Sequence, residues 1–243
     1  MTEMFETLLD RGCEGIPLTL SRVQKEQFFE YYELLVQWNR VMNLTTITEV
    51  SDVITKHFVD SLLLIRVISG DEISSYHCMD VGTGAGFPGI PLKIAFPELQ
   101  ITLLDSLNKR VGFLNEVIQR LELPNIFAVH GRAEDYGRNM KYREQYDLCV
   151  SRAVANLSTL SEYCIPFVKQ DGFFISYKSG KAEDEILKAR IAVKKLGGEM
   201  KPVVSLFLPG TDVERIFIPI KKIGITPEKY PRKAGMPSKE PLK

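Results

Sequence analysis

The fold is decided by the stretch MDVGTGAGFPG, residues 79–89, which lies between a short apolar run and a second apolar stretch at residues 92–96. Glycines at such a point let the backbone turn tightly and approach a ligand closely. Their order is G-x-G-x-G, and Phe87 stands where the dinucleotide-binding pattern G-x-G-x-x-G requires its third glycine. This spacing disfavours a nicotinamide enzyme. It leaves two interpretations, a turn that binds another cofactor or a tight strand–helix turn without a ligand.

Short apolar runs alternate with helical stretches around this turn. The runs are residues 78–81, 101–104, 126–130, 148–150 and 173–177. The clearest helices between them are expected at residues 108–121 and 182–196. Such alternation predicts an α/β fold with a mostly parallel sheet and helices on both faces. Residues 203–208 and 215–220 predict a closing antiparallel pair of strands.

The first 70 residues have a different pattern, which is helical throughout. Apolar residues recur at helical spacing before Asn39, which is expected to end that helix; they are Phe28, Tyr32, Leu35 and Val36. A second amphipathic helix is expected around residues 58–65. The sequence therefore predicts an N-terminal helical extension on the α/β core.

An acid follows the second apolar run. Asp105 lies about 20 residues past the glycines, where a carboxylate can accept hydrogen bonds from ribose hydroxyls. It could instead cap the following helix, a role that Ser106 could also fill. After the third run, backbone groups of Ala133 and Glu134 are placed to hydrogen-bond an adenine, while Arg132 could equally pair with a surface acid.

Asp80 followed by G-x-G-x-G resembles the first motif of class I S-adenosylmethionine-dependent methyltransferases. That resemblance implies a Rossmann-like fold with a mostly parallel seven-stranded sheet, the last strand antiparallel, and S-adenosylmethionine as cofactor. The end of the fourth run narrows the chemistry. It reads Ser151-Arg152-Ala153-Val154, and not the Asn/Asp-Pro-Pro-aromatic segment of exocyclic-amine methyltransferases or the Pro-Cys of cytosine-C5 enzymes.

Guanine N7 suits a site of this kind because its lone pair is already nucleophilic. Its methylation needs no general base. It needs alignment and exclusion of water, and proximity can supply several kcal/mol. No acid–base residue is therefore expected. Arg152 would hold guanine O6, a phosphate or the cofactor carboxylate.

Further motifs resemble the bacterial 16S ribosomal RNA guanine-N7 methyltransferases, also called glucose-inhibited division protein B. They include Trp38-Asn39, Asn43-Leu44-Thr45, Lys56-His57-Phe58-Val59-Asp60-Ser61-Leu62, Gly131-Arg132-Ala133-Glu134, Ser151-Arg152-Ala153, Lys178-Ser179-Gly180 and Tyr230-Pro231-Arg232-Lys233. The resemblance covers nearly the whole chain. It implies N7 methylation of one guanosine, position 527 in the usual numbering, in the 16S rRNA of the small ribosomal subunit.

The glycine pattern and this resemblance together define the candidate site. The cofactor-binding candidates are Asp80, Gly82, Gly84, Gly86, Phe87, Asp105, Ala133, Glu134 and Arg152. The positioning candidates are Arg152, His57 and Lys178, with Asp60 bordering the pocket. The RNA-binding candidates are Asn43, Lys109, Arg110, Arg132, Lys178 and Arg232, and each cation taken alone could be a solvated charge.

Composition limits the other classes of function. The chain has 243 residues with 31 basic and 31 acidic side chains, so the whole molecule is not an electrostatic binder of nucleic acid. Its four cysteines and three histidines are scattered, which predicts no metal site. No apolar run approaches the roughly 20 residues of a membrane span. We expect a soluble, cytoplasmic protein, with a monomer favoured although the sequence does not give the oligomeric state.

The expected division is a helical extension at residues 1–70, a methyltransferase domain at 71–223 and a basic tail at 224–243. The tail is either a nucleic-acid contact or a solvated terminus. Two other functions stay open at this point, a methyltransferase for a small molecule or protein and a non-catalytic RNA-binding protein. Steep loss of affinity with salt would favour an RNA substrate.

Overall fold

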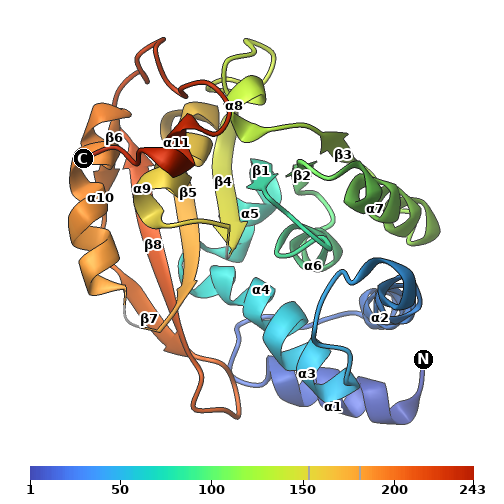
Figure 1. The fold of residues 1–243 in the computed structure, drawn as a ribbon. Coiled ribbons are helices and arrows are strands. Elements are labelled where there is room, and N and C mark those ends of the chain that lie inside the picture. Colours follow the sequence, from blue (N-terminus) through green and yellow to red (C-terminus); the bar gives the residue numbers. More distant parts are fainter. Residues whose placement is uncertain (153, 181) are drawn as a thin grey trace.

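A sheet of eight strands runs through the centre of the molecule in the order β3-β2-β1-β4-β5-β8-β6, with β7 also paired to β8 (Figure 1). The computed structural model describes residues 1–152, 154–180 and 182–243, so Ala153 of the Ser151-Arg152-Ala153 motif lies outside the described residues. The strands are β1 His77–Val81, β2 Gln100–Asp105, β3 Ile126–His130, β4 Tyr146–Arg152, β5 Val168–Ser179, β6 Gly198–Met200, β7 Val204–Phe207 and β8 Glu214–Lys222. β1 to β5 are mutually parallel, and β8 is antiparallel to β5.

Helices cover both faces of this sheet, as the alternating pattern predicted. Those within and after the sheet region are α6 Gly89–Ala95, α7 Asn108–Arg120, α8 Ala133–Tyr136, α9 Leu157–Cys164, the 3-10 turn η3 Ile165–Phe167, α10 Glu183–Lys195 and α11 Met236–Lys239. The expected helices at residues 108–121 and 182–196 are therefore confirmed. α10 has acids in its first turn and lysines in its last, an order that the helix dipole favours.

The expected closing pair of strands is confirmed as β7 and β8, but the sequence did not reveal β6. β6 and β7 lie end to end along β8, where one strand of the expected sheet would run. Residues 201–203 interrupt it, and Pro202 lacks the N–H that a ladder hydrogen bond requires. The sheet therefore has eight strands where seven were expected, because two short strands occupy the place of one.

The N-terminal elements are largely helical, as predicted, and pack on the helices α6 and α7. They are α1 Glu3–Cys13, α2 Arg22–Met42, α3 Val50–Val53, the π-helical turn η1 Ile54–Val59, α4 Asp60–Leu62, the 3-10 turn η2 Leu63–Arg66 and α5 Gly70–Ser75. The prediction that Asn39 ends its helix is wrong. α2 continues to Met42 and ends at Asn43, which adopts the left-handed conformation, while the Asn39 side chain accepts the Thr45 N–H at 2.8 Å.

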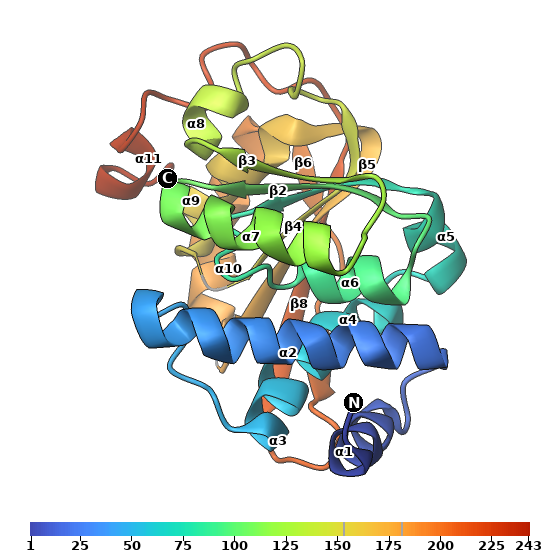
Figure 2. The same cartoon turned by 90° about the vertical axis from the view of Figure 1, so that its right-hand side faces the viewer.

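α2 crosses the molecule next to α6 and α7 (Figure 2). Its buried aromatic face includes Tyr31 rather than the predicted Tyr32, which is half-buried. Phe5 of α1, Phe28 of α2 and Leu103 of β2 belong to one hydrophobic core. The N-terminal helices therefore share a core with the sheet, and the division at residues 70 and 223 stays a prediction. No helix among the described residues is long and apolar enough to cross a membrane.

Candidate functional site

A pocket of about 680 Å³ opens at the carboxyl ends of the parallel strands. That volume is typical of small-molecule sites. It lies at the boundary between β1 and β4, where the strand order reverses direction. Open α/β sheets bind ligands at such points. The lining residues used below come from the loop after α2 (Leu44, Thr45, Ile47), from η1 and α4 (Lys56, His57, Asp60), from the glycine turn (Gly82, Thr83, Gly84, Ala85, Phe87), from the end of β2 and after it (Asp105, Ser106, Arg110), and from β4, β5 and β8 (Arg152, Lys178, Arg215).

The three glycines of the turn have positive φ angles, +69°, +63° and +98° for Gly82, Gly84 and Gly86. Gly82 and Gly84 line the pocket, whereas Gly86 does not. A Cβ at Gly86 would lie 2.4 Å from Ile90 and 2.7 Å from the Tyr31 hydroxyl. The first two glycines thus shape the pocket wall, and the third permits close packing of the turn on α2, where the Tyr31 hydroxyl donates to the Ala85 carbonyl.

Asp80 lies behind the turn and is fully buried. Its Oδ2 accepts hydrogen bonds from the Thr83 hydroxyl at 2.7 Å and from the Gly89 N–H at 2.9 Å. Burial raises the pKa of this carboxyl to about 7 despite those bonds. Asp80 does not line the pocket. Its hydrogen bonds instead join the two ends of the glycine turn.

Asp105 does line the pocket, at the end of β2. Its Oδ1 accepts from the Leu107 N–H at 2.9 Å, which helps the chain start α7, although Asp105 is not the cap residue of that helix. Its Oδ2 accepts from the Gly84 N–H at 2.9 Å and from Arg110 at 3.4 Å. The carboxylate therefore joins β2 to the glycine turn at the pocket wall.

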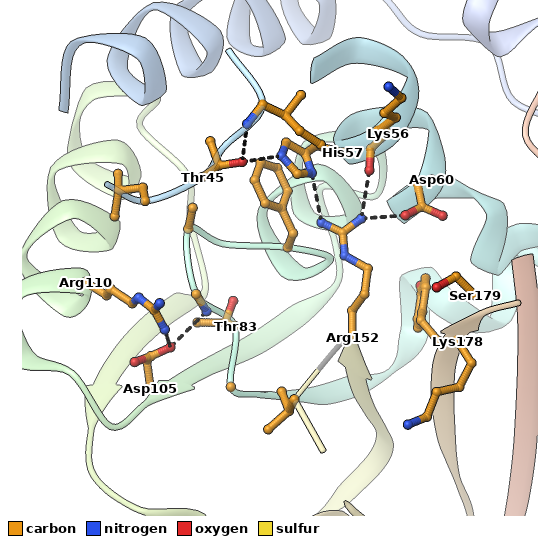
Figure 3. Close-up of a pocket in the computed structure, with 18 of the residues that line it drawn as sticks. Thr45, Lys56, His57, Asp60, Thr83, Asp105, Arg110, Arg152, Lys178 and Ser179 are labelled. Atoms are coloured by element: carbon orange, nitrogen blue, oxygen red, sulfur yellow. Dashed lines mark hydrogen bonds and ion pairs between the residues drawn. The ribbon is translucent and has the colours of Figure 1, made fainter. Parts of the chain in front are cut away.

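A cluster of charged and aromatic side chains forms the opposite wall (Figure 3). Arg152 donates to Asp60 Oδ2 at 2.8 Å, and Arg215 donates to Asp60 Oδ1 at 2.8 Å. The Arg152 guanidinium also lies 5.1 Å from the centre of the Phe87 ring, within the range of a cation–π contact. Asp60, which is 2% exposed, thus fixes an arginine from β4 and one from β8 at the pocket.

His57 lies in the same wall and is neutral. Its ring stacks on Phe87 at 4.4 Å between centroids. Nδ1 lies 3.4 Å from an Arg152 nitrogen, which can only donate, so the proton is assigned to Nε2, 2.9 Å from the Thr45 hydroxyl. Burial and then the Arg152 charge lower the pKa of His57 to about 3. It therefore acts as a fixed hydrogen-bonding group at neutral pH and not as a proton carrier.

Acidification tests this assignment through stability. Because the pKa of His57 is about 3 when folded and about 6.5 when unfolded, the unfolded chain binds more protons between these values. The free energy of unfolding of the wild type should then fall as pH drops below 6.5, by up to about 2 kcal/mol at pH 5 from this group. Urea unfolding of His57→Gln should lack that loss, with His130→Gln as a control for removing an exposed imidazole. Equal pH slopes for wild type and His57→Gln would refute the neutral assignment.

The sequence matches one protein family over most of its length. The family model described as rRNA small subunit methyltransferase G matches residues 24–211. Ribosomal RNA small subunit methyltransferase G from Lachnoclostridium phytofermentans is 53% identical over 235 residues, covering 96% of this chain and 95% of that one. The protein of the same name from Alkaliphilus oremlandii is 49% identical, covering 97% and 98%. This chain belongs to the rRNA small subunit methyltransferase G family.

Solved structures place this family member in its fold class. NSun6 from Pyrococcus horikoshii has a TM-score of 0.53 at 12% identity, covering 68% of this chain and 52% of that one. TrmN from Thermus thermophilus has a TM-score of 0.51 at 14% identity, covering 70% and 53%. At such identities the likeness concerns the fold alone. The predicted Rossmann-like class I methyltransferase fold is confirmed.

Among the candidates implied by the family resemblance, Lys178 does not turn its ammonium into the pocket. It donates at 2.6 Å both to the Ala155 carbonyl and to Glu185 of α10. Its contacts therefore anchor the loop after β4. Arg110 lines the pocket, and Lys109 beside it is exposed.

Two more RNA candidates are exposed, whereas a third is bound to a buried acid. Asn43 and Arg132 are exposed, and Asn43 directly precedes pocket-lining residues. Arg232 is bound instead to the fully buried Glu162, through its backbone N–H at 2.7 Å and its guanidinium at 2.7–3.2 Å. The structure thus gives Arg232 an internal partner that charge counting could not reveal.

Ala133 and Glu134 follow β3, which is the strand next to β2, so they also lie at the carboxyl ends of the parallel strands. Neither lines the pocket, and both are buried. The loop before them is attached to the pocket wall, because the Gly131 N–H donates to the Asp105 carbonyl at 3.0 Å. Glu134 accepts the Gly235 N–H at 2.8 Å.

Sequence reasoning missed Arg215 and Tyr31. Arg215 is the second residue of the antiparallel strand β8, and the start of an antiparallel strand lies on the side of the sheet where the parallel strands end. The expected antiparallel direction of this strand was therefore the sequence signal that could have placed Arg215 at the pocket. Within the described residues no group of three or more histidine, cysteine or acidic side chains could hold a metal ion.

Proposed function

We propose that the protein transfers a methyl group from S-adenosylmethionine to N7 of one guanosine in 16S rRNA, position 527 in the usual numbering. Family membership supports the enzyme class and the small-subunit rRNA substrate. The observation that carries the N7 assignment is the state of the pocket's titratable groups. Asp60 is held between two arginines, and His57 is a weak base whose Nδ1 lone pair faces Arg152, so neither is poised to remove a proton. N7 attack requires no such group.

The residues present fit S-adenosylmethionine. Its ribose hydroxyls need an acceptor, which Asp105 supplies with lone pairs beyond those used in its existing bonds. Its carboxylate needs a cation, and Arg110 and Arg152 both line the pocket. Gly84 presents backbone with no atom within 4 Å of a Cβ position, so a ligand can approach it closely.

The cofactor contacts we propose follow from these positions. Gly82, Gly84, Phe87, Asp105 and Arg152 would touch the cofactor directly. Asp80 and Gly86 would act through the shape of the turn. Ala133 and Glu134 would border the adenine, because their loop is bonded to the end of β2.

The bound cofactor supplies a methyl group activated by a sulfonium. The chain's own residues align the base and exclude water, and proximity of this kind can contribute several kcal/mol. The stacked pair His57 and Phe87, together with Arg152, forms a rigid wall against which the base can be positioned. Because N7 carries no proton, the absence of a general base from this mechanism is consistent with the reaction.

The RNA backbone would follow the exposed cations at the pocket rim. Lys109 and Arg132 are exposed, and Arg110, which follows Lys109 in α7, is half-buried. Such phosphate contacts orient the RNA without reading its sequence. We place the reaction in the cytoplasm, on the small ribosomal subunit or its RNA.

Transfer of labelled methyl from S-adenosylmethionine to small-subunit particles and to naked 16S rRNA tests this proposal. We expect label at one guanosine, mapped by chain cleavage at N7-methylguanosine, and a rate that falls steeply with salt. Measurable cofactor binding without transfer to either RNA would reject the RNA substrate. It would favour a small-molecule or protein substrate instead.

A further inference from the structure

The basic tail is neither a free terminus nor an open cationic arm. Residues 226–242, here called the C-terminal strap, run back across α8 and α9, and Figure 1 shows this red segment with α11 beside α9. Thr226, Tyr230, Pro237 and Leu242 are buried. Tyr230 and Leu242 belong to the hydrophobic core on this face of the sheet.

Arginines of the body hold the first half of the strap by its backbone. The Arg143 guanidinium, in a side chain 9% exposed, donates to the Thr226 carbonyl at 2.6 Å and the Tyr230 carbonyl at 2.8 Å. Arg138 donates to the Pro231 carbonyl at 2.7 Å. A buried guanidinium, that of Arg143, that donates only to backbone carbonyls, most of them in this segment, indicates that the position of the segment is specified and not incidental.

The second half of the strap is bonded to the two helices that follow β3 and β4. The Gly235 N–H donates to Glu134 of α8 at 2.8 Å. The Thr159 hydroxyl of α9 donates to the Pro237 carbonyl at 3.0 Å, and Arg232 pairs with Glu162 of α9. One short segment thus ties α8 to α9.

Both helices are linked to the pocket. The loop into α8 is bonded to the end of β2, through the Gly131 N–H to the Asp105 carbonyl and through a 3.1 Å contact between His130 and the Ser106 carbonyl. Asp105 and Ser106 line the pocket. α9 follows the loop that contains pocket-lining Val154.

We propose that the C-terminal strap is a positioning element for the cofactor site, with Arg232 and Thr159 as positioning residues that fix α9 and, through Gly235, Glu134 of α8. This assignment rests on the proposed function, since it takes S-adenosylmethionine as the ligand of the pocket. The strap's role is to hold the adenine side of the site in its binding geometry. Supporting contacts of this kind keep the groups that touch a ligand within the tolerance that binding requires.

Three variants separate this role from RNA binding. Arg232→Ala removes the cation on Glu162, and Thr159→Val keeps the side-chain shape while removing the hydroxyl that binds Pro237. Lys233→Ala is the matched control, because Lys233 is an exposed cation of the same strap. The dissociation constant of S-adenosylmethionine is measured by calorimetry on the full chain without RNA. RNA affinity and the split between kcat and KM are measured separately.

We expect Arg232→Ala to raise the S-adenosylmethionine dissociation constant about tenfold and Thr159→Val about threefold. KM for the cofactor should rise with them while kcat at saturating cofactor stays within about twofold. Arg232→Lys, which keeps a cation, should recover part of the affinity. Lys233→Ala should change neither cofactor nor RNA binding.

Weaker RNA binding in Lys233→Ala, together with unchanged cofactor binding in Arg232→Ala, would overturn the proposal in favour of an RNA contact. If Arg232→Ala does not fold, Thr159→Val decides, and an unchanged dissociation constant there overturns it. Failure of the wild type to methylate RNA while it binds the cofactor would reject the RNA substrate but not the strap's role. A wild type that does not bind S-adenosylmethionine would overturn both.

Discussion

Replacing Asp60 with alanine is expected to lower the free energy of unfolding by about 3–5 kcal/mol. The carboxylate is 2% exposed and accepts from Arg152 and Arg215, whose side chains are 14% and 15% exposed. Without it, two poorly solvated cations face each other with no acid between them. Arg152 would also leave the pocket wall, so methyl transfer should fall by about 100-fold or more.

Urea unfolding and methyl transfer to small-subunit particles measure these two effects. Asp52→Ala is the matched control, because Asp52 lies in the neighbouring helix and forms an exposed pair with Lys56 at 2.9 Å. That variant should lose no more than about 0.5 kcal/mol. A stability of Asp60→Ala within about 1 kcal/mol of the wild type would show that the two arginines do not depend on this carboxylate.

The main elements of the sheet were predictable because each has a strong local pattern. β3 has the predicted bounds, 126–130, and α7 begins at the predicted residue 108. Elements without such a pattern were not predictable. β6 has three residues, and its pairing with β8 is decided by tertiary packing. The end of α2 was misplaced because Asn39 bonds to Thr45, a contact across the helix end that spacing does not show.

The sequence predicted the location of the candidate site better than the role of each residue in it. The glycine turn after β1 and Asp105 at the end of β2 lie at the pocket, where the positions of these residues in the sequence placed them. Arg215 was missed because it is far along the chain, and only antiparallel pairing brings it to Asp60. Arg232 carries the same formal charge as Lys233, but the sequence could not tell that only Arg232 faces a buried carboxylate.

Substitutions at two glycines of the glycine turn should also have large effects, one on stability and the other on cofactor affinity. Gly86→Ala is expected to destabilise the fold by about 2–5 kcal/mol, from left-handed backbone strain and overpacking together. Its φ is +98°, and a Cβ there would meet Ile90 at 2.4 Å and Tyr31 at 2.7 Å. Urea unfolding checks this expectation.

Gly84→Ala is the matched variant, with a φ of +63° and nothing within 4 Å of its Cβ position. Its stability loss should be limited to backbone strain of about 1–2 kcal/mol, because no neighbour must move. Gly84 lines the pocket, however, so the added methyl group would occupy space that we assign to S-adenosylmethionine. Calorimetry should show that a folded Gly84→Ala protein binds the cofactor at least about tenfold more weakly, since a single methyl group that blocks close approach can cost about 1.4 kcal/mol or more. Wild-type affinity in that variant would mean that the cofactor does not lie against this turn, whereas wild-type stability in Gly86→Ala would mean that α2 does not hold the turn from behind.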